Sequence, residues 1–499
     1  MIIITHTENV KLKTHNVKRI KYMKTTTIHR IISFFVLTVM LITSFRIDLY
    51  ARSFNKIVDI KLKDGDTIVY FGDSITQFGA KPGGYVSLVR ETIDQAYPDK
   101  NINVIGAGIG GNKVTDLQKR VERDVLSHKP SIVVIYVGIN DVWHWTKPHP
   151  VTKAKREGTT AENYAAGLRE IVDKVQASGA TVILCTPSVI SEKIAPKDPN
   201  YVLLEQYADI VRSVSREKGT HLIDLREKFV SYLTEHNKQG RSKGVLTFDT
   251  VHMNSAGNGF IAKHMLNALN VNTEHSYQGK KKKLDIYLCI GQSNMAGRAP
   301  LLEKDQEGVS NAYLFDFKDQ WTQASNPMNR YSTIRKGMEM QKLSPSYPFA
   351  KKMASSQKNA VGLIVNAMGG TSINIWQPET HFYHEILRRV KKAEETGTLK
   401  GIIWHQGEAD YQDANYLDKL VHLITSLRKD LGNEKLPFVV GQINGIDLIN
   451  NQLAKLPQKL PHTAVVSSEG LVAQDKWHFN NESVYKLGEA YAEKMLKLQ

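Results

Sequence analysis

Short apolar runs alternate with longer amphipathic segments along most of this 499-residue chain. In its first half the apolar runs are three to six residues long and rich in Ile and Val, as buried strands are. The segments between them repeat their apolar residues at the helical period, so the alternation predicts a mainly parallel sheet with helices on both faces. The expected strands are 67–71, 102–105, 132–137, 181–185 and 221–223, and the expected helices are 84–97, 114–126, 161–177, 202–218 and 255–269.

The pattern restarts after a polar, charged stretch at 272–283, which we interpret as an interdomain linker. The sequence therefore predicts two α/β domains with mainly parallel sheets, at 57–271 and 284–499. The second domain is expected to carry an insertion around 298–352, because its first two glycine-containing turns lie farther apart along the chain than those of the first domain. The strands expected there are 284–290, 361–366 and 402–404.

The N-terminal segment has the pattern of an export signal. Residues 31–45 form an uncharged apolar run of 15 residues that follows a basic region, and 51–53 offer a small-x-small cleavage site. The run is short for a membrane span. We therefore expect a signal peptide over 1–53, with Met23 as a possible true start, and a secreted or periplasmic protein without stable membrane association after cleavage. A single N-terminal membrane anchor is the alternative.

The net charge of +16 raises the question of a nucleic-acid partner. Residues 1–53 contain 9 Lys/Arg against 2 Asp/Glu, so much of the excess belongs to the predicted signal. No arginine-rich stripe interleaved with aromatic residues follows, and nucleic-acid binding is therefore not expected. The two cysteines, Cys185 and Cys289, lie within apolar runs and are expected to be buried free thiols.

Polar residues with complementary chemistry follow several strands of the first half. Ser74 lies in the turn after the first strand, where open α/β folds keep their reactive groups. His252 and Asp249 are three residues apart, so both can face the same side of one segment. Gly111 can offer a backbone N–H, and Asn140 a side-chain amide. Together these residues supply the nucleophile, base, orienting carboxylate and oxyanion donors that acyl transfer needs.

These segments, in order, resemble the four motif blocks of the SGNH (GDSL-type) hydrolases. The resemblance covers about 57–271 and implies a three-layer α/β/α, flavodoxin-like fold. It implies that Ser74 is the nucleophile and His252 the base, and that the Ser74 N–H, Gly111 and Asn140 form the oxyanion hole. Members cleave esters without metal or cofactor, so none is expected. The segments are Gly-Asp-Ser at 72–74, Gly111, Gly-Ile-Asn-Asp at 138–141 and Asp-x-x-His at 249–252.

The second half contains a related set of motifs. They are similar to those of the sialate O-acetylesterases and family-six carbohydrate esterases (acetylxylan esterases), over about 283–499. The resemblance implies Ser293 as nucleophile, His478 as base, and Gly370 with Gln406 as oxyanion donors. The motifs are Gly-Gln-Ser-Asn-Met at 291–295, Met-Gly-Gly-Thr at 368–371, Trp-His-Gln-Gly-Glu at 404–408 and Asp-Lys-Trp-His at 475–478.

The orienting acid of this second set is left open by the sequence. Asp475 is favoured by its spacing from His478, which equals that of the first domain. Glu408 is the rival, because the Glu of its motif serves in some relatives.

The two resemblances together predict a secreted carbohydrate O-acetylesterase with two active sites. O-acetylated sialic acid and acetylated xylan-type glycans both suit the second family. Two alternatives remain: one domain is a catalytically silent carbohydrate-binding module, or the protein is a broad lipase or thioesterase. Four aromatic residues beside the motifs are candidates either for stacking on sugars or for packing at the sheet edge. They are Trp143, Trp145, Trp376 and Tyr411.

Overall fold

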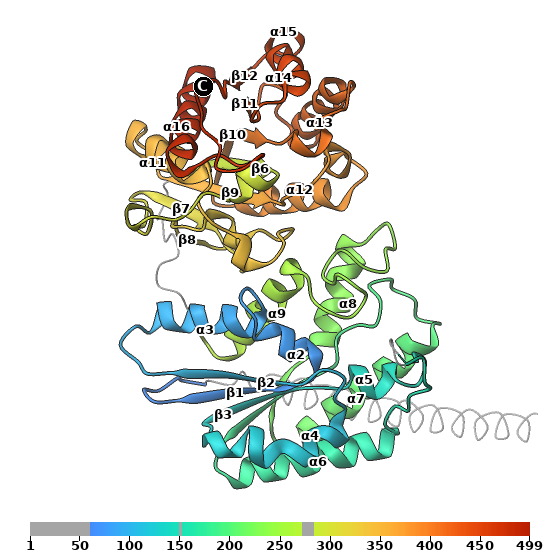
Figure 1. Cartoon of the computed structure of the whole chain (residues 1–499). Helices are drawn as coiled ribbons and strands as arrows, with labels where there is room; N and C mark the ends of the chain where they lie inside the picture. The colour runs from blue at the N-terminus through green and yellow to red at the C-terminus, as the bar shows by residue number, and fades with distance from the viewer. Residues whose placement is uncertain (1–59, 149–151, 272–283) are drawn as a thin grey trace, which may run out of the picture. The chain divides into compact units, whose positions relative to one another are not determined.

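The computed structural model describes residues 60–148, 152–271 and 284–499 (Figure 1). The predicted signal peptide and linker lie outside these residues. In the part of the chain that is described, no helix combines the length and hydrophobicity needed to cross a membrane. The described residues form two α/β domains with mainly parallel sheets, which confirms the predicted fold class.

The first domain is built on a five-stranded parallel sheet in the order β2-β1-β3-β4-β5. Figure 1 shows α3 and α9 over one face of this sheet and α4 and α6 over the other. The strands are β1 (Thr67–Gly72), β2 (Asn103–Gly108), β3 (Ile132–Tyr136), β4 (Thr181–Cys185) and β5 (His221–Ile223). The helices are α2 (Ser74–Gly79), α3 (Tyr85–Ala96), α4 (Val114–Asp124), α5 (Ile139–Trp143), α6 (Ala161–Ala177), α7 (Pro199–Lys218), α8 (Leu225–His236) and α9 (Ser255–Ala268).

The second domain has a seven-stranded sheet in the order β12-β11-β10-β6-β9-β7-β8, in which only β8 is antiparallel to its neighbour. Two clusters of buried apolar side chains cover its faces, one contributed by α12 and α13 and the other by α11 and α16. The strands are β6 (Leu284–Gly291), β7 (Ala312–Phe315), β8 (Trp321–Gln323), β9 (Val361–Ala367), β10 (Gly397–His405), β11 (Phe438–Gly441) and β12 (Thr463–Val466). The helices are α10 (Ser293–Ala296), α11 (Ser346–Ser356), α12 (His381–Ala393), α13 (Tyr416–Asp430), α14 (Asp447–Ala454), α15 (Leu456–Lys459) and α16 (Asn481–Leu498).

The central strands are buried on both faces, which explains their unbroken apolar sequences. In β1, Ile68 to Phe71 are fully buried, and in β3 every residue is buried. Each fully buried Val, Leu, Ile or Phe side chain stabilises the fold by roughly 1.5–3 kcal/mol. Cys185 in β4 and Cys289 in β6 are buried free thiols, as expected. Burial raises the pKa of both thiols, so neither is a reactive nucleophile.

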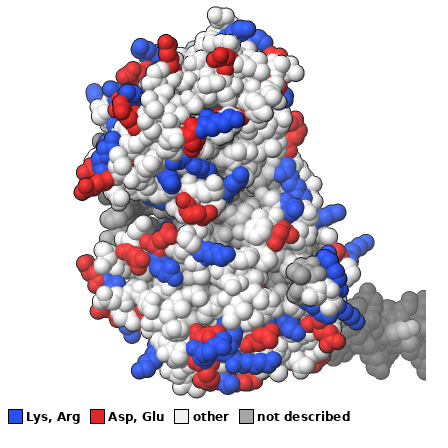
Figure 2. Space-filling view, in the orientation of Figure 1, with Lys and Arg blue, Asp and Glu red and all other residues white. Residues whose placement is uncertain are grey.

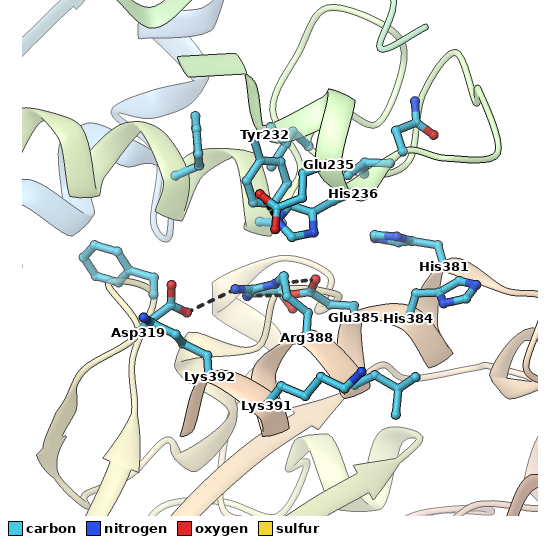
Figure 3. Close-up of a pocket in the computed structure, with 18 of the residues that line it drawn as sticks. Tyr232, Glu235, His236, Asp319, His381, His384, Glu385, Arg388, Lys391 and Lys392 are labelled. Atoms are coloured by element: carbon cyan, nitrogen blue, oxygen red, sulfur yellow. Dashed lines mark hydrogen bonds and ion pairs between the residues drawn. The ribbon is translucent and has the colours of Figure 1, made fainter. Parts of the chain in front are cut away.

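The insertion of the second domain supplies the β7–β8 hairpin at one edge of the sheet. Asp319, in the hairpin turn, pairs with Arg388 of α12 at 3.2 Å, and Arg388 also pairs with Glu385 at 2.9 Å (Figure 3). Burial alone would raise the pKa of Glu385, but the neighbouring guanidinium groups outweigh it and lower this pKa to about 2. These paired charges therefore tie the insertion to α12.

A glycine ends the strand before each candidate nucleophile. A Cβ atom at Gly72 would overlap the carbonyl oxygen of Tyr136 on the neighbouring strand. A Cβ atom at Gly291 would overlap the carbonyl of His405, and its φ of +138° is one that other residues rarely adopt. Glycine thus lets each strand end tightly against its neighbour, so that Ser74 and Ser293 stand at the start of α2 and α10.

Candidate active sites

The structure brings Ser74, His252 and Asp249 together at the carboxyl edge of the first sheet. The hydroxyl oxygen of Ser74 lies 2.8 Å from Nε2 of His252, and Nδ1 of His252 lies 2.7 Å from Oδ2 of Asp249. If Nδ1–H donates to the carboxylate, Nε2 is free to accept the serine proton. Ser74 and His252 are 178 residues apart in the sequence. The contact therefore depends on the fold and not on local spacing.

The Asp249 carboxylate is held by the segment that it organises. Its Oδ1 accepts the backbone N–H of His252 at 2.8 Å and that of Val251 at 3.1 Å. Burial raises the pKa of Asp249, but the bonds from the His252 side chain and from these two amides outweigh it and hold the pKa below its usual value. Asp249 is therefore a stable anion that orients the imidazole.

The expected oxyanion donors lie on neighbouring turns. Gly111 has a φ of +79°. A Cβ atom at Gly110 would lie 3.9 Å from Cβ of Ser74, so this loop passes beside the nucleophile. Asn140 is buried at the start of α5, and its Nδ2 donates to the carbonyl of Asn112 at 3.0 Å. That bond fixes the amide and leaves a second N–H for a developing negative charge.

The second site has an acid–base pair of the same geometry. Nδ1 of His478 lies 2.8 Å from Oδ2 of Asp475, whose Oδ1 accepts the backbone N–H of Trp477 at 2.8 Å and that of His478 at 2.9 Å. As at Asp249, burial raises the pKa of Asp475, and the bonds from His478 and the two amides outweigh it and lower the pKa. Ser293 is 6% exposed. Among the hydrogen bonds of the described residues, none joins Ser293 to His478.

Glu408 occupies a different place in the second site. Its Oε1 accepts the side-chain amide of Asn294 at 2.7 Å. Its Oε2 is buried and has no hydrogen-bond partner in the described part of the chain. Burial raises the pKa of Glu408 to about 7. Asp475, and not Glu408, is therefore the carboxylate that holds His478 in this structure.

Two buried aspartates show how the turns of the two domains correspond. Asp141 accepts the backbone N–H of Val114 at 3.1 Å, and Asp410 accepts that of Ile373 at 2.8 Å. Each donor lies three residues after the glycine expected in the oxyanion hole, and each aspartate lies three residues after a positive-φ glycine at the end of a central strand. The turns after β3 and β10 are therefore equivalent in the two domains.

The amide side chains reach equivalent places from different positions on these turns. Nε2 of Gln406 donates to the carbonyl of Thr371 at 2.9 Å, just as Nδ2 of Asn140 donates to that of Asn112. Each carbonyl belongs to the residue after the oxyanion-hole glycine. Gln406, however, precedes the positive-φ glycine of its turn, whereas Asn140 follows it. The two amides therefore reach equivalent carbonyls from different positions relative to the positive-φ glycine of the turn.

The Gln406 amide is more heavily occupied than that of Asn140. Its Nε2 also lies 3.1 Å from Oε1 of Gln292 and close to a carboxylate oxygen of Asp410, and its Oε1 accepts the hydroxyl of Tyr416 at 2.9 Å. Two N–H groups thus face three acceptors. Gln406 lies where the sequence predicts an oxyanion donor, but in this structure both of its N–H groups are already engaged.

Sequence reasoning missed a buried glutamate beside the first site. Glu192 is fully buried, and its carboxylate accepts the backbone N–H groups of Val245 at 2.8 Å, Leu246 at 2.6 Å and Thr247. This irregular segment, in which Thr247 forms an isolated bridge with Met253, leads directly to Asp249. Burial is the largest effect on Glu192 and raises its pKa despite these bonds. No motif marks Glu192, since its partners lie more than 50 residues away.

The four aromatic candidates divide into exposed, partly buried and buried residues. Trp143 is partly buried and packs against the core of the first domain. Trp145 is 41% exposed and Tyr411 48% exposed, and Tyr411 lies 6.2 Å from the ring of Trp477. Trp376 is fully buried and packs edge-on against Trp404 at 5.3 Å. Its function is therefore packing, whereas Trp145 and Tyr411 remain available to a sugar.

The surface charge and the titratable side chains of the described residues bear on the expectations for nucleic-acid and metal binding. Figure 2 shows acidic and basic side chains interspersed on the face in view, without an extended basic stripe. Across the described ranges, no group of three or more His, Cys, Asp or Glu side chains is arranged to hold a metal ion.

A serine, histidine and aspartate at the carboxyl edge of a mainly parallel α/β sheet define the class of serine ester hydrolases. Two family models match this chain. One is the carbohydrate esterase, sialic acid-specific acetylesterase family, over residues 283–497. The other is the GDSL-like lipase/acylhydrolase family, over residues 70–259. The chain belongs to the carbohydrate esterases of the sialic acid-specific acetylesterase family and carries a GDSL-like acylhydrolase domain before that region.

Individual proteins are similar to part of this chain. An acetylxylan esterase of Geobacillus stearothermophilus is 31% identical over 218 residues, which cover 42% of this chain and 95% of that protein. A probable carbohydrate esterase of Arabidopsis thaliana is 28% identical over 236 residues, covering 42% and 90%. A crystal structure of an acetyl xylan esterase is 38% identical, with a TM-score of 0.38, and covers 41% of this chain and 99% of that one.

Proposed function

We propose that this protein removes O-acetyl groups from glycans at two active sites, centred on Ser74 and Ser293. The observation that carries the proposal is the pair of matching acid–base segments, Asp249 with His252 and Asp475 with His478. The substrate class follows from the acetylxylan esterase and carbohydrate esterase relatives, with O-acetylated sialic acid and acetylated xylan-type glycans as the candidates. We also propose export, on the strength of the apolar run at 31–45.

The chemistry at each site is acyl transfer through the serine. The serine Oγ attacks the acetyl carbonyl carbon while the histidine Nε2 takes the hydroxyl proton. The tetrahedral intermediate then collapses, and the sugar oxygen leaves with that proton. Water, deprotonated by the same histidine, attacks the acetyl-enzyme. The bond to the serine Oγ then breaks, the histidine returns the proton to that oxygen, and acetate is released. In each site the aspartate stabilises the imidazolium that forms in both steps.

The negative charge of each intermediate needs hydrogen-bond donors. In the first site these are the N–H groups of Ser74 and Gly111 and the free N–H of the Asn140 amide. In the second site the N–H groups of Ser293 and Gly370 occupy the corresponding positions in the sequence. Gln406 contributes there if substrate displaces one of its three present acceptors.

Serine variants test the number of sites. Single Ser74→Ala and Ser293→Ala proteins are assayed with p-nitrophenyl acetate and for acetate release from acetylated xylan and acetylated mucin. We expect each variant to lose part of the activity and the double variant to lose all of it. One single variant with no activity beside another with full activity would show that the protein has one active site.

One observation favours that alternative, in which the second domain binds carbohydrate without cleaving it. Ser293 and His478 share no hydrogen bond in this structure, whereas Ser74 and His252 do. The two readings differ in the Ser74→Ala protein, which retains activity only if the second site is catalytic. A series of esters of increasing acyl length tests the lipase alternative, because activity that rises beyond butyryl would exclude an acetylesterase.

A further inference from the structure

Asn294 contacts both peptide groups that flank His478. Its Nδ2 donates to the carbonyl of Trp477 at 3.0 Å, and its Oδ1 accepts the N–H of Phe479 at 3.2 Å. Asn294 is 2% exposed and directly follows Ser293. The residue next to the nucleophile thus holds the backbone on both sides of the base. Asn294 and Phe479 are 185 residues apart in the sequence.

Other side-chain bonds hold the segment that carries His478 at its outer residues: Nδ2 of Asn444 donates to the carbonyl of Lys476 at 3.2 Å, and Nε2 of Gln474 donates to that of Arg298 at 3.1 Å. Residues 474–476 are exposed, as is the side chain of Asp475 at 49%. The backbone closes through two bonds, from Gln474 N–H to the carbonyl of His478 at 2.8 Å and from Asn480 N–H to the carbonyl of Val472 at 3.0 Å. These bonds shape the segment itself. The Asn294 amide is what joins the peptide groups beside His478 to the turn of Ser293.

Glu408 fixes the direction of that amide. Its Oε1 accepts Nδ2 of Asn294 at 2.7 Å, so both N–H groups of the amide are used, one by Glu408 and one by Trp477. Oδ1 must then face Phe479. No Lys or Arg of the described residues pairs with Glu408; Nε2 of the buried His405 lies 3.9 Å from its Oε1, and the Asp410 carboxylate is a further neighbour that raises its pKa. Nδ1 of His405 lies 3.0 Å from the hydroxyl of Tyr491.

We propose that Asn294 and Glu408 are positioning residues of the second site, which hold His478 in reach of Ser293. The proposal rests on the proposed catalytic function of that site. The first domain has no equivalent, because Ile75 follows Ser74 and cannot hydrogen-bond through its side chain. In the first domain, the Glu192 carboxylate accepts backbone N–H groups of the segment that precedes Asp249 and His252.

A double-mutant cycle tests the role of Asn294. All variants carry Ser74→Ala, so that p-nitrophenyl acetate reports the second site alone. Asn294→Ala is expected to lower kcat about 100-fold and to change KM less than threefold, because the base is misplaced while the binding surface is kept. Adding Asn294→Ala to His478→Ala is expected to cause no further loss, since two residues that act as one unit are not additive.

Glu408 provides a second measurement that does not depend on the folding of the Asn294 variant. Glu408→Gln retains an acceptor for the Asn294 amide and is expected to keep most of the activity. Glu408→Leu has a similar volume without an acceptor and is expected to lose about tenfold in kcat. Melting curves of all variants separate this loss from unfolding.

The possible outcomes are distinct. Losses that multiply in the Asn294→Ala/His478→Ala protein, or equal activities of the two Glu408 variants, overturn the positioning role and leave the proposed function intact. A Ser74→Ala protein no more active than Ser74→Ala/Ser293→Ala overturns the catalytic function of the second site and the positioning role with it.

Discussion

The two candidate sites share one local element and differ in the residues that support it. In both, an aspartate accepts two backbone amides and the Nδ1 of a histidine three residues later. Both segments close with a bond to the carbonyl of the histidine, from Phe248 at 2.9 Å and from Gln474 at 2.8 Å. The internal geometry of this acid–base segment is determined locally, because the bonds just named lie within a few residues of one another.

The contacts between that segment and the rest of each domain are different. The first site joins Ser74 to His252 directly and supports the segment with Glu192, which accepts backbone amides. The second site has no Ser293–His478 bond in the described structure and supports the segment through Asn294 and Glu408. A buried glutamate thus supports each base, but from unrelated chain positions. Support of the histidine is therefore preserved while the residues that supply it change.

The amide donors differ in the same way. Asn140 and Gln406 lie against equivalent carbonyls, yet one follows and the other precedes the glycine of its turn. Asn140 has an N–H to spare, and Gln406 has none. If a side-chain amide stabilises the oxyanion in both sites, bound substrate must displace one of the acceptors that now engage the Gln406 amide. Otherwise the oxyanion of the second site is stabilised by backbone N–H groups alone.

Removal of either base is expected to have the largest effect and to show whether the two sites use the same chemistry. His252→Ala in a Ser293→Ala background, and His478→Ala in a Ser74→Ala background, are each expected to lower kcat about 10⁴-fold or more, because serine is not deprotonated without its base. Steady-state hydrolysis of p-nitrophenyl acetate measures both. A loss below tenfold for His478→Ala would mean that the resemblance of the second site is one of shape alone.

The acids are expected to have the next largest effect and to separate Asp475 from Glu408. Asp475→Asn in the Ser74→Ala background should lower kcat about 10³- to 10⁴-fold. The imidazolium of His478 loses its stabilising carboxylate, and the proton of the neutral imidazole is no longer fixed on Nδ1. Glu408→Gln should lower kcat less than tenfold. Asp249→Asn in the Ser293→Ala background is the matched control and should resemble Asp475→Asn. The reverse order of the two second-site variants would make Glu408 the acid.

Removal of the Asn140 amide is expected to affect mainly kcat, whereas removal of the Gln406 amide is expected to affect mainly stability. Asn140→Ala should lower kcat about 10²- to 10³-fold with little effect on the melting temperature, because its free N–H acts on the transition state. Gln406→Ala removes a fully buried amide and leaves the carbonyl of Thr371 without its partner, whereas the hydroxyl of Tyr416 keeps the backbone carbonyl of residue 406. It should lower the melting temperature of the second domain by several degrees, since a buried carbonyl without a partner costs about 1–3 kcal/mol. Calorimetry and kcat together measure both effects, and equal melting temperatures would contradict the distinction.

Local signals explain what could be predicted from the sequence. The strands expected at 181–185 and 221–223 match β4 and β5, because an apolar run flanked by turns is read within a few residues. The run expected at 102–105 differs from β2, Asn103–Gly108, since glycines that read as a loop extend the strand beside β1. The short strands β7, β8, β11 and β12 and the helix α8 were not predicted. The four strands are too short to show a period, whereas Leu225, Phe229 and Leu233 of α8 do recur at the helical spacing, and sequence reasoning missed that signal.

The candidate sites divide by the same rule. Asp249 with His252, and Asp475 with His478, could be paired from spacing because the three-residue offset is all that their bond needs. The contact of Ser74 with His252 was inferred from the order of motifs. Glu192 lies in no motif, because the backbone amides that it accepts are more than 50 residues away and require no particular residue type. Asn294 and Glu408 lie in two of the quoted motifs, but their bond to each other and the contact of Asn294 with the backbone beside His478 depend on the fold and could not be read from the sequence.

The smallest expected effect is on the pH dependence of stability, and it distinguishes the buried glutamate of the second site from an ordinary carboxylate. Burial raises the pKa of Glu408 from 4.5 to about 7, so between these values the folded domain binds more protons than the unfolded chain. The free energy of unfolding must therefore fall as the pH rises through this window. Glu408→Gln removes the titration. The variant should gain stability relative to the parent from pH 4.5 to 7, by at most about 3 kcal/mol. Urea unfolding of the second domain at several pH values measures this difference.

The exposed Glu434→Gln is the control and should follow the parent at every pH. A parallel course for Glu408→Gln and the parent would show that Glu408 is charged in the folded protein, and its bond to Asn294 would then be charge-assisted.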